Sequence, residues 1–256
     1  MVELNQLLAW CNSTLNVKAF KDYCPNGLQI EGSHTVHKIV TAVTASQEAI
    51  DAAIAANADV LMVHHGYFWK GEPAPLTGMK GQRIKKLLLH NISLIAYHLP
   101  LDAHVTLGNN AALADLLDIK ITGPLDPAES QPIGNVGELA TPMTVDAFIS
   151  HLAARLQRTP LHLAATDSSQ TATIQKVGFC TGAAQDFLDK AAALGCDAYI
   201  SGEVSERTYH EAKELGIHYF ACGHHATERG GIRRLGQALA QQFNLEVIFM
   251  DFNNPV

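Results

Sequence analysis

The sequence predicts an α/β protein made of two related halves, each a sheet of mostly parallel strands between two layers of helices. Apolar runs of strand length alternate with helical patterns nearly throughout the chain, which is typical of parallel sheets covered by helices. A strand, helix and strand pattern also recurs along the chain. Gly, Pro and Asp gather at residues 121–130, so we expect one half over residues 1–125 and the other over residues 126–256.

The elements follow from the spacing of apolar residues. The first residues, MVELNQLLAWCN, predict an amphipathic helix, because they lack the basic segment and the cleavage site of a signal peptide. Short apolar runs predict strands at 39–44, 60–63, 93–98, 177–181, 198–201, 218–222 and 246–250. Helical periodicity predicts helices at 47–56, 82–90, 110–117, 145–156, 186–194, 206–215 and about 227–243.

The repeat is visible when residues 38–65 are set against residues 176–203. At a constant offset of 138, the identical pairs include Lys38 and Lys176, Gln47 and Gln185, Asp51 and Asp189, Ala53 and Ala191, and Asp59 and Asp197. A duplication places His64 and His65 at positions equivalent to Gly202 and Glu203. The alternative is chance similarity between two unrelated strand, helix and strand units.

Composition limits the class of function. With 47% hydrophobic residues broken regularly by Gly, Pro or charge, no segment approaches the ~20 apolar residues of a membrane span, and we expect a cytoplasmic protein without a membrane partner. Five scattered cysteines without a CxxC pair predict reduced thiols. A net charge of -7 argues against a broad nucleic-acid-binding face but leaves open a local basic pocket around Arg229, Arg233 and Arg234.

Polar residues cluster where three predicted strands end. His64 and His65 follow the strand at 60–63, while His98 and Asp102 follow the next strand along the chain. A third cluster, with His224 and Glu228, follows the strand at 218–222. In open α/β sheets the carboxyl ends of the strands are where ligands bind, so these three clusters predict a site.

The residue types predict a site for two metal ions. Imidazole and carboxylate together are ligands for Zn, Fe, Mn, Ni or Co. Adjacent residues of an extended chain point opposite ways, so His64 and His65 suit two neighbouring ions better than one. His224 and Glu228 lie four apart on one helix face, and a glutamate can bridge two ions. Taken singly, each cluster also fits core, turn or helix-terminus residues.

Five motifs lie in order along the chain, at residues 21–33, 63–71, 98–104, 201–206 and 223–231. Together they resemble the GTP cyclohydrolase 1 type 2 homologue family of Nif-three-like, YbgI-like proteins with a dinuclear metal centre. The resemblance implies a Nif-three-like fold and a ring-shaped homohexamer. It also implies that the metal ligands are His64, His65, Asp102, His224 and Glu228, with Glu228 bridging.

Two functions remain open from the sequence. The first is a hydrolase that uses water activated by two divalent transition-metal ions on a purine nucleotide or a related cyclic amide or phosphoester, with Glu203 and His98 as general acid/base groups. The second is a metal-binding interaction module or metal chaperone, linked by the resemblance to DNA-damage or transcription partners. These five ligands are too few to saturate two metal ions. Coordination positions would stay open for water or substrate, which favours the hydrolase.

Overall fold

The computed structural model describes residues 1–165 and 173–256, and the chain divides into two compact units. Unit 1 contains Met1–Leu101 and Gly231–Asn253, and unit 2 contains Asp102–Gly230 and Asn254–Val256. These bounds differ from the two halves expected from the sequence, because residues 231–253 belong with the first unit and residues 102–125, including Asp102, with the second. Their strand β13 pairs with β4 there, a long-range pairing that periodicity does not reveal.

Unit 1 is built on a five-stranded sheet in the order β13-β4-β5-β6-β2, with β1 and β3 as a separate pair. The first four strands are parallel and β2 is antiparallel to β6. In the middle, Ile39, Val40, Ala42 and Val43 of β4 are all buried, as expected for a strand covered on both faces. The strands are β1 (Val2–Glu3), β2 (Gly27–Ile30), β3 (Thr35–Val36), β4 (Lys38–Thr44), β5 (Val60–His65), β6 (Ser93–Ala96) and β13 (Glu246–Phe249).

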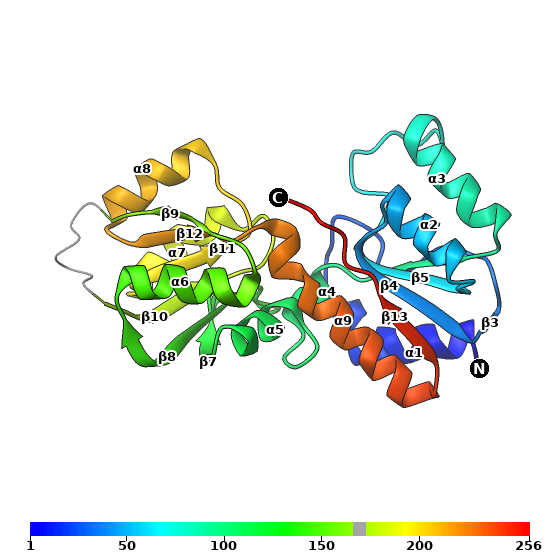
Figure 1. Cartoon of the computed structure of the whole chain (residues 1–256), viewed down its shortest axis with the longest axis horizontal. Helices are drawn as coiled ribbons and strands as arrows, with labels where there is room; N and C mark the ends of the chain where they lie inside the picture. The colour runs from blue at the N-terminus through cyan, green and yellow to red at the C-terminus, as the bar shows by residue number, and fades with distance from the viewer. Residues whose placement is uncertain (166–172) are drawn as a thin grey trace. The chain divides into compact units, whose positions relative to one another are not determined.

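Helices cover both faces of the unit 1 sheet (Figure 1). On one face, Ile50 of α2 and Leu87 of α3 join the buried side chains of the strands in one apolar core. On the other face lie α1 and the later part of α9, where Gly236 packs against Thr41 of β4. The helices are α1 (Leu4–Thr14), η1 (Val17–Ala19), α2 (Gln47–Ala55), α3 (Gly78–Leu89), α4 (Leu99–Ala103) and α9 (His224–Phe243), and the last two each contain a unit boundary.

Unit 2 is built on a six-stranded sheet in the order β7-β8-β10-β11-β12-β9. Its three central strands are parallel, and antiparallel strands flank them on both sides. The sequence analysis did not foresee the flanking strands. The strands are β7 (Ile119–Pro124), β8 (Asn135–Met143), β9 (Leu161–Leu163), β10 (Ile174–Phe179), β11 (Ala198–Ser201) and β12 (His218–Ala221).

Unit 2 also has three layers. Phe148 of α6 and Leu113 of α5 pack on one face of the sheet with Val177 and Phe179, while Leu188 of α7 packs on the other face. The helices are α5 (Asn109–Leu116), α6 (Val145–Leu156), η2 (Gln185–Phe187), α7 (Leu188–Ala193) and α8 (Glu206–Leu215). The α/β class and the three-layer halves expected from the sequence are therefore confirmed. Among the described helices, none combines the length and apolarity needed to cross a bilayer.

The relation between the halves extends to single hydrogen bonds. Asp59 Oδ2 accepts the backbone N–H groups of residues 37 and 38 at 2.7 and 3.0 Å. Its equivalent, Asp197 Oδ2, accepts those of residues 175 and 176 at 2.9 and 2.8 Å. Asn57 and Gly195, also equivalent, both end their helices with positive φ, at 52° and 69°. The same aspartate ties the same two strands together in each unit.

Candidate metal centre

In unit 1, His64 and His65 are the last two residues of β5. His64 is fully buried, and its Nδ1 lies 2.8 Å from the carbonyl oxygen of Tyr97. Because a carbonyl oxygen only accepts hydrogen bonds, the neutral ring carries its proton on Nδ1 and its lone pair on Nε2. His65 Nδ1 lies 3.2 Å from Thr44 Oγ1 at the end of the neighbouring strand. Nδ1 of each ring thus has a hydrogen-bonding partner near the end of a neighbouring strand.

His98 follows β6 and is paired with a carboxylate. Its Nδ1 lies 2.7 Å from Asp22 Oδ1, and Asp22 Oδ2 accepts hydrogen bonds from Asn26 Nδ2 at 2.8 Å and from the Leu99 N–H at 2.9 Å. Burial raises the pKa of the Asp22 carboxyl, but the hydrogen bond and charge of His98, with the other donors, outweigh it and hold the pKa below its usual value. Asp22 is therefore an ionised, fixed partner for His98.

These three histidines form one group in unit 1. Their ligand atoms all lie within 4.8 Å of one another, and the ring centroids of His64 and His65 are 4.5 Å apart. This group could hold a metal ion. Asp22, Cys24 and His98 form a second such group, but burial raises the pKa of the Cys24 thiol to about 12, with the charge of Asp22 adding to the shift. At neutral pH this thiol stays protonated, and the thiolate is the form that binds metals.

In unit 2, two buried carboxylates lie close together. Asp102 of α4 accepts a hydrogen bond on Oδ1 from Asn109 Nδ2 at 2.8 Å, and the hydroxyl of Thr181 lies 3.4 Å from the same oxygen. Glu228 of α9 is 3% exposed, and ligand oxygens of the two carboxylates lie within 4.8 Å of each other. Burying two negative charges this close is costly unless positive charge compensates them. The pair is therefore suited to a cation.

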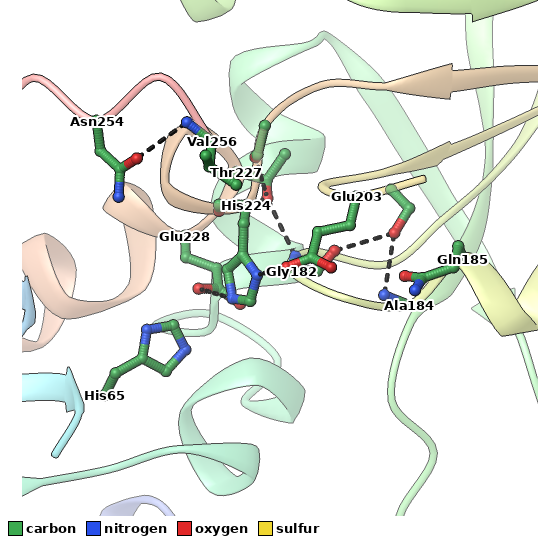
Figure 2. A network of polar contacts seen from close by, with 12 residues as sticks. His65, Gly182, Ala184, Gln185, Glu203, His224, Thr227, Glu228, Asn254 and Val256 are labelled. Carbon is green, nitrogen blue, oxygen red and sulfur yellow. Dashed lines mark hydrogen bonds and ion pairs between the residues drawn. The ribbon is translucent and has the colours of Figure 1, made fainter. Parts of the chain in front are cut away.

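His224, the first residue of α9, lies between two glutamates (Figure 2). Its Nε2 is 3.1 Å from Glu228 Oε2 one turn along the helix, and its Nδ1 is 2.7 Å from Glu203 Oε1. The hydroxyl of Tyr219 donates to the carbonyl oxygen of Glu203 and so fixes the backbone there. Burial lowers the pKa of His224, but hydrogen bonds and charge from Glu228 and then Glu203 outweigh it and raise the pKa to about 9.

Two glycines make room for this arrangement. A Cβ on Gly182 would stand 2.2 Å from Glu228 Oε1 and 3.2 Å from His224 Nε2. A Cβ on Gly202 would stand 2.6 Å from the Cα of His224, so glycine lets the start of α9 approach the end of β11. The imidazole and carboxylate donors of His224 and Glu228 fit a transition-metal ion.

The structure places the residues expected from the sequence in two groups. Unit 1 brings together His64, His65 and His98, and unit 2 brings together Asp102, Glu203, His224 and Glu228. Sequence reasoning missed the orienting partners, above all Asp22, which lies 76 residues from His98 along the chain. Its one signal was its place in the motif at residues 21–33. Gly182 and Asn109 gave no signal.

Comparison with known proteins gives matches along the whole chain. A model of the family Duf34/NIF3 (NGG1p interacting factor 3) matches residues 2–255. A Vibrio cholerae protein named "GTP cyclohydrolase 1 type 2 homolog" is 50% identical over 251 residues, 98% of each chain. An Escherichia coli (strain K12) protein of the same name is 51% identical over 253 residues, 99% of this chain and 98% of that protein.

Solved structures agree with these matches. A structural-genomics structure of the protein ybgI, described as of unknown function, has a TM-score of 0.95 and 49% identity, covering 100% of both chains. The structure of TTHA1606 from Thermus thermophilus has a TM-score of 0.88 and 29% identity, also covering 100% of both chains. The similarity thus extends over fold and sequence together, and the chain belongs to the Duf34/NIF3 family.

Proposed function

We propose that this protein is a metal-dependent hydrolase that acts on a purine nucleotide or a related cyclic amide or phosphoester. The proposal rests on one observation, that Nδ1 of each expected histidine ligand is held by a partner in its own unit. Those partners are the Tyr97 carbonyl for His64, the Thr44 hydroxyl for His65 and the Glu203 carboxylate for His224. Such contacts are characteristic of metal-binding histidines and assign coordination to Nε2.

The ligand set is the one that the motifs indicate. His64, His65, Asp102, His224 and Glu228 would hold two divalent transition-metal ions per chain, of Fe, Zn, Mn, Ni or Co, with Glu228 contributing both oxygens. When bound, such ions lower the pKa of a coordinated water from 15.7 towards about 7 and stabilise developing negative charge. The relatives' printed name, GTP cyclohydrolase 1 type 2 homolog, favours a purine nucleotide among the substrate classes.

The chain's own residues would orient the ligands and move protons. Asp22 holds Nδ1 of His98, so His98 would exchange a proton with the leaving group through Nε2 as general acid/base. Sequence analysis gave Glu203 the same role. Its contact with His224 supports a different assignment, in which Glu203 positions a metal ligand rather than touching substrate.

Metal content and turnover, measured on the same preparations, test the proposal. Wild type should hold about two ions per chain, as two-metal sites do, and should hydrolyse at least one compound in a screen of nucleotides, phosphodiesters and cyclic amides. Glu228→Ala should lose more metal than His65→Ala, because a bridging carboxylate serves both ions. His64→Ala should lose metal and turnover together, while His90→Ala, an exposed histidine of unit 1, should lose neither.

Two outcomes would contradict it. Wild-type protein prepared without chelators and found free of metal would refute the metal centre. A fully loaded protein that turns over no compound in the screen, and that binds a protein or nucleic-acid partner only with its metals, would instead establish the interaction module or chaperone.

A further inference from the structure

The N-cap position of helix α9 is a glycine, which has no side chain. The first residue of the helix is His224, and Thr227 N–H donates to the carbonyl oxygen of Gly223 at 3.0 Å, which makes Gly223 the N-cap. An N-cap side chain normally accepts a hydrogen bond from the N–H of the second or third helical residue. Glycine cannot do this, so the N–H of His225 needs another acceptor.

Arg158 explains why the capping position holds glycine. Gly223 has φ of +95°, and a Cβ there would stand 2.7 Å from Arg158 Nη1. Arg158 lies just after α6, where its backbone N–H donates to the Ala153 carbonyl oxygen at 3.2 Å. The guanidinium therefore lies against the backbone of the N-cap, where a side chain of the usual capping type would displace it and would strain the backbone at this φ.

The missing acceptor comes from residues 254–256, which we call the strap. The His225 N–H donates to the Val256 carbonyl oxygen at 3.1 Å, and Arg158 Nη1 donates to the Pro255 carbonyl oxygen. Within the strap, the Val256 N–H donates to Asn254 Oδ1 at 2.9 Å. Figure 2 shows Asn254 and Val256 beside the first turn of α9, which carries His224, Thr227 and Glu228. All these residues belong to unit 2.

We infer that the strap supplies the capping acceptor that Gly223 lacks and so positions the metal ligands in the first turn of α9, with Arg158 as the residue that holds the strap in place. A carbonyl oxygen at a helix N-terminus satisfies an N–H donor and interacts favourably with the positive end of the helix dipole. His224 and Glu228 are the first and fifth residues of this helix. Fraying of the first turn would move both side chains away from the coordinating positions set by Glu203 and Gly182.

The inference rests on the proposed function only in taking His224 and Glu228 as ligands, and its test has one measurement that needs no metal. The variants are a chain lacking residues 254–256, Arg158→Met and Arg158→Lys. Val256→Ala serves as a control because it keeps the backbone carbonyl. Arg155→Met is the matched arginine control, since Arg155 pairs with Asp118 on the surface.

Two measurements are made on each variant. Hydrogen exchange of the His225 amide in metal-free protein reports whether the helix is capped, and Zn²⁺ affinity by chelator competition reports whether the metal ligands are in position.

We expect faster exchange at His225 in the shortened chain and in Arg158→Met, while the amides of β10 to β12 keep their protection. Zn²⁺ affinity should fall roughly 10–100-fold, the range for loss of a contact that orients a metal ligand. Arg158→Lys should restore part of the amide protection and part of the Zn²⁺ affinity, and the two controls should match wild type.

Unchanged exchange and affinity in the shortened chain would overturn the inference. If wild type binds no Zn²⁺, the proposed function fails, and exchange at His225 alone decides whether the strap caps the helix.

Discussion

At the residue scale, the contact between Glu203 and His224 defines the role of Glu203 as a residue that orients a metal ligand. Its Oε1 accepts from Nδ1 of the metal ligand candidate His224, and removing the negative charge weakens that hydrogen bond. We predict that Glu203→Gln lowers metal affinity roughly 10–100-fold, the usual effect of losing an outer partner. Competition with a chelator measures the affinity.

The control for Glu203→Gln is Glu206→Gln, which makes the same chemical change at an exposed position of α8. Metal affinity in this control should equal that of wild type. A Glu203→Gln protein that keeps its metal affinity but loses about 10²–10⁴-fold in turnover would restore the general acid/base role.

Gly182 allows a second prediction with a closely matched control. Gly182→Ala should lose metal because its Cβ would stand 2.2 Å from Glu228 Oε1 and displace that side chain. Both Gly182 and Gly216 have positive φ, +70° and +67°, but a Cβ on Gly216 meets nothing within 4 Å. Gly216→Ala should therefore show only the backbone strain of a left-handed residue, about 1–2 kcal/mol.

Urea unfolding and elemental analysis separate the two glycine variants. Gly182→Ala should unfold at lower urea than Gly216→Ala and contain less metal, while Gly216→Ala should keep the wild-type metal content. Equal metal content in the two variants would show that Glu228 tolerates the added methyl group.

The sequence revealed the candidate ligands that follow strands, but not the contacts that orient them. His64 and His224 stand directly after apolar runs, so local pattern marks them. Asp22 and Asn109 act through side-chain contacts with His98 and Asp102, which arise only when the chain is folded. Patterning along a chain has no information on such contacts. Asp22 had only its place in a motif, and Glu203 was assigned a different role.

At the element scale, buried helices and strands can be predicted from the sequence because burial requires a regular pattern of apolar residues. Helices α6 and α8 have the predicted bounds, 145–156 and 206–215. The central parallel strands are buried on both faces and appear as apolar runs. In contrast, β7 and β9 are mostly exposed or half-buried, and half-exposed flanking strands give no continuous apolar run. The edge strand β13 was predicted because residues 247–249 are all apolar, so edge strands without such a run are the ones that sequence reasoning misses.

Strand β9 leads to a prediction about acid stability. His162 Nε2 lies 3.0 Å from His218 Nδ1 of β12, and the ring stacks on Phe220 with centroids 4.7 Å apart. Burial, then the charge of His218, lowers the pKa of His162, against a smaller opposing effect of Asp146. The unfolded chain thus binds this proton more tightly, so stability is fully present above about pH 6.5 and falls as the pH decreases below it.

The variant His162→Gln cannot take up this proton, so its melting temperature should decline less than that of wild type on acidification below about pH 6.5. His210→Gln on α8, where His210 is exposed, is the control and should follow wild type. Parallel curves for wild type and His162→Gln across this range would show that His162 does not contribute to acid sensitivity.

At the scale of the whole molecule, the two units share a framework but differ in chemistry. The equivalent aspartates Asp59 and Asp197 keep the same hydrogen bonds, whereas the equivalent positions His65 and Glu203 hold a different residue in each unit. In unit 1 this position supplies a candidate ligand. In unit 2 it supplies the carboxylate that orients one. The framework is constrained by backbone hydrogen bonding, while the side chains at the strand ends are free to diverge.

The surface of unit 1 leads to a prediction about assembly. Helix α3 exposes Met79, Leu88 and Leu89, which are 67%, 55% and 71% exposed, and Leu76 just before it is 52% exposed. Exposed apolar side chains gathered on one element mark interaction surfaces. The family resemblance implies a homohexamer, so we predict that light scattering at micromolar concentration returns six times the 27.6 kDa chain mass. Leu88→Glu with Leu89→Lys should lower that mass, because charge on this helix opposes burial. Val105→Glu, at an isolated exposed position of unit 2, should not, and a monomer in wild type would contradict the prediction.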